Sequence, residues 1–160
     1  MAVVLASAAF WATVNYKLVG DEGEPACVNF RARFKRLKTT ERKDLDRRLA
    51  AGRMDERGRE RLKAQLQLSH LTADDREEIE AQLKAAPAND KDFLDAVLVD
   101  WDLTDLTRNR IPYTLATRAE VVEEWDGIEG ALVTAYFDAG RKARQATEIA
   151  KNSEAPSATA

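Results

Sequence analysis

The stretch F-R-A-R-F-K-R-L-K at residues 30–38 places five basic side chains around two phenylalanines. Residues 27–34, C-V-N-F-R-A-R-F, alternate between apolar and polar, as a strand with one buried face does. The apolar face carries Val28, Phe30, Ala32 and Phe34. The other face carries Asn29, Arg31 and Arg33. The pattern therefore predicts a half-buried strand whose arginines face water.

A second strand is predicted just before it, at V-N-Y-K-L-V (14–19), which alternates in the same way. The connecting stretch D-E-G-E-P-A (21–26) contains a glycine and a proline, both of which favour turns. Two alternating strands joined by such a short connection predict an antiparallel β-hairpin with one solvated face.

After Leu37 the apolar spacing changes to that of helices, but the apolar stripes in residues 40–86 are narrow. Each of three predicted helices carries one pair of apolar residues four positions apart: Leu45/Leu49, Leu62/Leu66 and Ile79/Leu83. Gly52 is expected to stop the first helix, and Thr72 with Asp75 has the form of a capping box. Such thin stripes leave two alternatives open: the segment packs against a partner, or it is helical only part of the time.

Residues 89–139 have wider apolar stripes, which predict core helices. Asn89 is expected to cap a helix with the apolar face Phe93, Leu94, Val97, Leu98 and Trp101. After a loop over 102–113, Thr114 is expected to cap a helix carrying Val121, Val122 and Trp125. Asp126 and Glu129 are expected to cap a last helix with the apolar face Ile128, Leu132, Val133, Tyr136 and Phe137.

The sequence thus predicts an α+β protein, mostly α, in which an N-terminal antiparallel β-hairpin packs on a bundle of about five or six helices. We expect one domain over 1–150, with the hairpin at 10–38, a charged helical segment at 39–86 and a helical core at 89–150. The tail 151–160 is small and polar at its end, and we expect it to be disordered.

Charge is unevenly distributed along a chain whose net charge is −3. Residues 31–48 carry nine Lys/Arg against three acids, and residues 90–129 carry eleven acids against four basic residues. Opposite charges of +6 and −7 suggest salt-sensitive self-association. A basic face of Arg31, Arg33, Lys35 and Arg36 raises nucleic-acid binding as an alternative, but the phenylalanines that would stack on bases point the other way.

The residues that carry common enzyme chemistry are sparse. The chain has a single cysteine, Cys27, and a single histidine, His70, which excludes an internal disulfide and a typical Cys/His zinc site. It has no Gly-rich phosphate loop and no G-x-S-x-G motif. The stretch D-W-D-L-T-D (100–105) resembles a cation loop in composition only. We therefore expect no catalysis, cofactor or metal.

The N-terminal stretch M-A-V-V-L-A-S-A-A-F-W lacks the basic start of a signal peptide, and no window reaches the ~20 apolar residues of a membrane span. A soluble, intracellular protein that does not bind membranes is expected.

Five motifs occur in an order and spacing that resemble one known family. They are F-W-A-T-V (10–14), F-R-A-R-F-K-R-L (30–37), D-F-L-D-A-V-L-V-D-W-D (92–102), I-P-Y-T (111–114) and I-E-G-A-L-V-T-A-Y-F-D-A (128–139). In this arrangement the chain resembles the tail assembly chaperones of long-tailed, siphovirus-like bacteriophages over roughly 10–38 and 89–141. The segment 53–86 is longer and more charged than the resemblance leads us to expect, so it looks like an insertion.

The resemblance implies a non-catalytic chaperone in the host cytoplasm that binds the tape measure protein, helps recruit tail tube subunits and is absent from the mature virion. Chaperoning a helical, apolar client requires exposed amphipathic helices. The candidate partner-binding residues are Leu62, Leu66, Ile79, Leu83, Leu132 and Tyr136, although a core position is the favoured interpretation for the last two. Besides the nucleic-acid-binding regulator, a phage-encoded inhibitor of a host protein remains an alternative.

Overall fold

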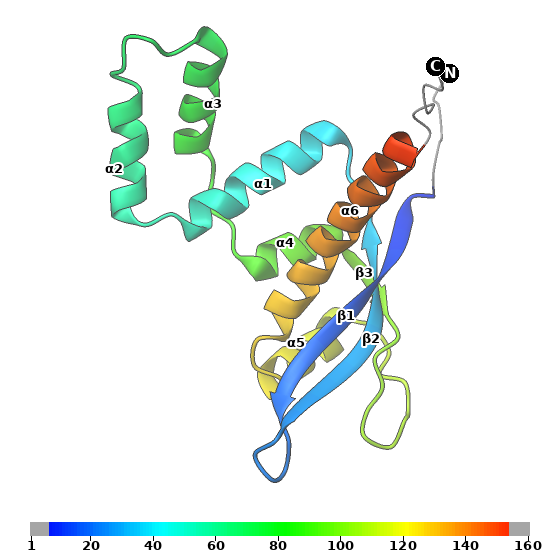
Figure 1. Cartoon of the computed structure of the whole chain (residues 1–160). Helices are drawn as coiled ribbons and strands as arrows, with labels where there is room; N and C mark the ends of the chain where they lie inside the picture. The colour runs from blue at the N-terminus through cyan, green and yellow to red at the C-terminus, as the bar shows by residue number, and fades with distance from the viewer. Residues whose placement is uncertain (1–6, 154–160) are drawn as a thin grey trace, which may run out of the picture. The chain divides into compact units, whose positions relative to one another are not determined.

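The computed structural model describes residues 7–153, which form two compact units. Unit 1 is made of two separate stretches, the described residues up to Phe34 and those from Leu98 onward. Unit 2 is the continuous segment Lys35–Val97. Figure 1 shows the elements of both units, and each unit is described by itself below.

Unit 1 is built on a three-stranded antiparallel sheet in the order β1-β2-β3. Strands β1 (Ala9–Val19) and β2 (Pro25–Lys35) form the predicted hairpin and are longer than the sequence pattern indicated. The turn between them is closed by a 2.7 Å hydrogen bond from the Gly20 N–H to the Glu24 carbonyl. Burial alternates along both strands, which confirms a sheet with one buried and one solvated face.

The third strand, β3 (Leu98–Trp101), occupies residues that the sequence assigned to a helix. Helix α4 (Asp90–Val97) ends earlier than predicted, and the chain then pairs with β2. Trp101 lies opposite Ala32, and Leu98 lies opposite Phe34. The helical prediction of 98–101 was therefore wrong: pairing with the free edge of β2 satisfies backbone groups that a helix would satisfy locally.

The buried face of this sheet is covered by α6 (Ile128–Ser153), which packs against β1, with α5 (Leu115–Glu124) beside α6 (Figure 1). Phe10, Phe34 and Tyr136 form a ring cluster with centroid separations of 5.5–5.8 Å. Such aromatic pairs add stability beyond the area they bury. Of the predicted apolar face of the last helix, Ile128, Leu132, Val133 and Tyr136 are buried, and Phe137 is half-buried.

The start of α6 differs from the prediction. Tyr16 stacks on Trp125 at 5.4 Å, and its hydroxyl donates to the Asp126 carbonyl at 2.7 Å. Burial, with a smaller contribution from Asp126, raises the pKa of Tyr16. The helix itself begins at Ile128, after Gly127, whose φ of 79° is a left-handed conformation that suits glycine. Asp126, which was predicted to cap this helix, instead contributes its backbone carbonyl as the acceptor for the Tyr16 hydroxyl.

Unit 2 contains four helices: α1 (Thr39–Arg53), α2 (Glu56–Gln65), α3 (Ala73–Lys84) and α4. Two predicted caps are confirmed, since Thr72 accepts a hydrogen bond from the Asp75 N–H and Asn89 accepts one from the Asp92 N–H. A third predicted cap lies in unit 1, where Thr114 accepts from the Thr117 N–H. Gly52 does not stop α1, which continues to Arg53.

The predicted fold class is confirmed: an N-terminal antiparallel hairpin is combined with six helices among the described residues. The predicted domain limits and the interpretation of 39–86 as an insertion stay predictions. Of the tail predicted to be disordered, 151–153 lie in α6, and 154–160 lie outside the described residues.

Candidate partner-binding surfaces

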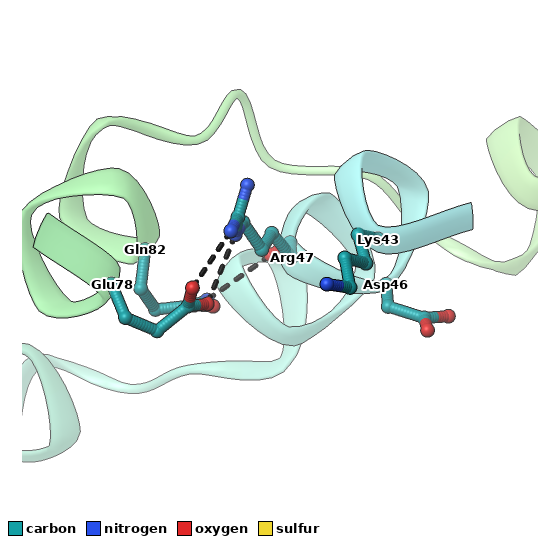
Figure 2. Close-up of a pocket in the computed structure, with 5 residues that line it drawn as sticks. All are labelled: Lys43, Asp46, Arg47, Glu78 and Gln82. Atoms are coloured by element: carbon teal, nitrogen blue, oxygen red, sulfur yellow. Dashed lines mark hydrogen bonds and ion pairs between the residues drawn. The ribbon is translucent and has the colours of Figure 1, made fainter. Parts of the chain in front are cut away.

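Helices α1 and α3 of unit 2 are joined by a paired arginine and glutamate, drawn in Figure 2. The Arg47 guanidinium donates to both carboxylate oxygens of Glu78, at 3.0 and 2.7 Å. The Gln82 amide donates to the Arg47 carbonyl at 3.1 Å. These residues line an open, polar hollow of about 400 Å³ together with Lys43 and Asp46. Arg47 bonds to both Glu78 and Gln82 across this hollow. We therefore assign these residues the role of holding α3 on α1.

The Arg47–Glu78 pair makes a prediction about pH. Hydrogen bonds from Arg47 lower the pKa of Glu78, so the pair contributes stability above the unfolded-state pKa that is lost as pH falls through the folded pKa. Arg47→Met is expected to raise the Glu78 pKa toward its ordinary value and to lower the urea midpoint at neutral pH. The difference from the parent should vanish in acid. NMR titration of the Glu78 carboxyl checks this.

Arg61→Met is the matched control, because Arg61 is exposed and makes no ion pair within the described chain. An Arg47→Met variant whose Glu78 pKa equals that of the parent would contradict the assignment.

A second groove lies within unit 2, between α3 and the end of α2 with its following loop. It has a volume of about 350 Å³ and is lined by Gln65, Leu68, Leu71, Asp75, Glu78 and Ile79. Neither α2 nor α3 contains a fully buried residue. This helical hairpin therefore keeps apolar side chains partly exposed to solvent, which a hairpin packed on both sides would not do.

The four candidate residues of this α2–α3 hairpin stay predictions, and the structure gives their positions. Leu62, Leu66, Ile79 and Leu83 are all half-buried. Only Ile79 lines the groove, and the other apolar lining residues are Leu68 and Leu71. Sequence periodicity missed these two leucines because both lie in the loop between the helices, outside any helical stripe. The sequence feature that marks Leu68 and Leu71 is that they are apolar residues in an otherwise polar connection.

Leu132 and Tyr136, the other two candidates, lie in the core of unit 1. Leu132 is 0% exposed and Tyr136 is 6% exposed. The structure thus places both where the favoured interpretation put them, and neither belongs to an exposed surface.

The basic face of the β1–β2 hairpin is partly neutralised within unit 1. Arg31 donates through its side chain to Asp102 at 2.8 Å, and its backbone N–H donates to the same carboxylate. Burial acts to raise the pKa of Asp102, but these hydrogen bonds outweigh it and the pKa is lowered. Arg33, Lys35 and Arg36 are exposed. The sheet face therefore carries less free positive charge than its sequence suggested.

Trp11, an exposed residue of β1, also lies on this face. The Arg31 guanidinium lies over the Trp11 ring at 5.2 Å from its centroid, and Trp11 is 42% exposed. The phenylalanines of β2 do point the other way, since Phe30 and Phe34 are buried. An exposed aromatic among cations is nevertheless the kind of platform on which bases stack.

Five of the eleven acids in residues 90–129 form an ion pair inside their own unit. In unit 2, Asp90 pairs with Arg53 and Asp95 pairs with Lys91. In unit 1 the acid–base pairs are Asp100–Arg110, Asp102–Arg31 and Glu129–Arg118. Self-association driven by the +6 and −7 segments stays a prediction. Only the pairs with Arg53 and Arg31 reduce the net charge of 90–129, because the bases of the other three pairs are already counted in it.

Sites for other chemistry are scarce in the part of the chain that the structure describes. Within 7–153 no group of three or more His, Cys, Asp or Glu side chains is placed to hold a metal ion. Asp105, in the stretch that resembles a cation loop, instead accepts hydrogen bonds from Thr107 and Asn109, which lower its pKa. Cys27 and His70 are exposed. None of the helices described here is long and apolar enough to cross a bilayer.

Comparison with known proteins gives one match. A family model described as phage tail assembly chaperone matches residues 1–147. The matched range includes all of unit 2, with the hairpin of α2 and α3, and unit 1 as far as residue 147. Neither a curated protein nor a solved structure matches the chain significantly.

Proposed function

The chain belongs to the phage tail assembly chaperones, and from this membership we propose that it binds the tape measure protein through the α2–α3 hairpin and helps to recruit tail tube subunits. The proposed role is non-catalytic. It is carried out in the host cytoplasm during tail building, and the protein is absent from the finished virion.

One observation carries the proposal: α2 and α3 pair with each other without fully burying any residue. Leu68 is 43% exposed, and Leu62, Leu66, Leu71, Ile79 and Leu83 are half-buried. A client with an apolar helical stripe gains about 1.5–3 kcal/mol for each large aliphatic side chain that it fully buries. A few such contacts suffice to hold an aggregation-prone segment.

Co-expression with the tape measure protein of the same phage tests the proposal. We expect the tape measure protein to become soluble and to co-elute with this chain, and to remain insoluble without it. Leu68→Ser should weaken the complex by about tenfold, since it removes one partly exposed apolar contact. Leu106→Ser is the matched control, because Leu106 is a fully exposed leucine in unit 1, outside the hairpin. A tape measure protein that stays insoluble in both cultures contradicts the proposal.

A second function, binding of single-stranded nucleic acid, is supported by Trp11 next to the Arg31 guanidinium, on a sheet where β2 also exposes Arg33 and Lys35. It predicts that the purified chain carries a raised absorbance ratio at 260 over 280 nm and quenches Trp11 fluorescence on adding an oligonucleotide. The remaining alternative, inhibition of a host protein, predicts capture of that protein with no effect on the tape measure protein.

A further inference from the structure

The groove between α2 and α3 combines apolar side chains with acidic ones. Leu68, Leu71 and Ile79 supply its apolar part. Asp75 and Glu78, which lie three residues apart on α3, supply two carboxylates, and no basic residue lines the groove. An occupant must therefore satisfy an apolar surface and a negative edge at once.

The two carboxylates differ in the charge that they leave for an occupant. Glu78 already forms an ion pair with Arg47, which neutralises most of its charge. Asp75 makes no side-chain ion pair with another residue of the described chain, so its charge is available. The whole of α3 shares this sign, with five acidic residues against Arg76 and Lys84. Helix α2 has the opposite balance, with four basic residues against Glu56 and Glu60.

The groove suits a helix better than an extended peptide. Helices α2 and α3 offer no unpaired strand edge along which an extended chain could add its backbone hydrogen bonds. A third helix laid along two neighbouring helices buries side chains at i, i+3, i+4 and i+7 in such a groove. That arrangement would cover the leucines that the hairpin leaves partly exposed.

We infer that the groove lined by Leu68, Leu71, Ile79, Asp75 and Glu78 receives an amphipathic α-helix whose apolar stripe is bordered by lysine or arginine on the side that meets α3. The inference rests on the proposed function, because it takes that helix to be a segment of the tape measure protein. It deepens the function by stating the chemistry of the recognised segment.

Two synthetic helical peptides test this on the full chain. Both have the same length and the same leucine spacing, and one flank of the stripe carries lysines in the first peptide and glutamates in the second. Fluorescence anisotropy should show the lysine peptide binding about two- to fivefold more tightly at low salt, as one partly exposed ion pair with Asp75 allows. The preference should fall at 1 M salt, where the Debye length is about 3 Å.

A pair of neighbouring variants identifies the groove. Asp75→Asn should reduce the preference for lysine by about two- to fivefold, since it removes one charge. Asp74→Asn is the matched control, because Asp74 is exposed on the same helix turn but does not line the groove. Equal binding of both peptides, binding of neither, or the same effect from both variants would overturn the inference.

The chaperone function and the binding chemistry of the groove can be contradicted separately. If the chain solubilises the tape measure protein but Leu71→Ser and Asp75→Asn leave that effect unchanged, the groove is the wrong site and the chaperone function stands. If the chain prefers the lysine peptide but does not solubilise the tape measure protein, the groove chemistry stands and its assigned client is wrong.

Discussion

Trp101→Ala is expected to destabilise unit 1 by about 3–5 kcal/mol, as truncating a fully buried tryptophan leaves a cavity that the surroundings only partly fill. Trp101 is 0% exposed, and its indole N–H donates to the Ile111 carbonyl at 2.8 Å. Its ring meets Tyr113 edge-on at 5.0 Å, and the Tyr113 hydroxyl donates to the Leu98 carbonyl. One side chain thus holds β3 and the following loop together.

Urea denaturation followed by tryptophan fluorescence measures this effect. All three tryptophans lie in unit 1, and Trp11 and Trp125 remain in the variant to report its unfolding. Trp101→Phe is the informative control, because it retains an aromatic ring and removes the N–H donor. It should cost about 1–3 kcal/mol, the penalty of leaving the Ile111 carbonyl without its donor. Equal losses for both variants would mean that the hydrogen bond, and not packing, dominates at this position.

The sequence predicted the elements whose signals are local. Alternation identified β1 and β2, and the cap residues Thr72, Asn89 and Thr114 marked three helix starts. The assignment of Leu98–Trp101 failed because F-L-x-x-V-L-x-x-W fits a helix as well as it fits a helix followed by a buried strand. Pairing with β2 makes these residues a strand, and β2 lies more than sixty residues earlier in the chain. A local sequence pattern cannot reveal such a distant partner.

Of the candidate surface, the sequence could indicate only residues that lie in helices, where the spacing of apolar residues shows which side they face. The narrow stripes agree with the absence of buried residues in α2 and α3, and Ile79 is the candidate residue that also lines the groove. Leu68 and Leu71 were missed because a loop has no period from which orientation can be inferred. The neutralisation of Arg31 was also missed, since Asp102 is 71 residues away in sequence and reaches it only once β3 has formed.

Gly52→Ala is expected to destabilise unit 2, although alanine is the better helix former by about 1 kcal/mol. A Cβ at position 52 would lie 2.0 Å from the Ala88 carbonyl oxygen. That carbonyl cannot easily move, because the Ala88 N–H donates to the Arg48 carbonyl at 2.9 Å and Ala88 is 3% exposed. Overpacking against fixed backbone costs about 1–3 kcal/mol or more, so we expect the clash to outweigh the gain in propensity.

Gly58→Ala, in the neighbouring helix α2, is expected to have the opposite effect on stability. Its added Cβ would meet only side-chain atoms, Met54 Cγ at 3.0 Å and Asp55 Oδ1 at 3.1 Å, and the flexible methionine can move. We therefore expect it to be neutral or to stabilise the protein by up to about 1 kcal/mol. Far-UV circular dichroism in urea compares the two variants. If Gly52→Ala raised the midpoint as Gly58→Ala does, the Ala88 segment would not pack on α1 as described.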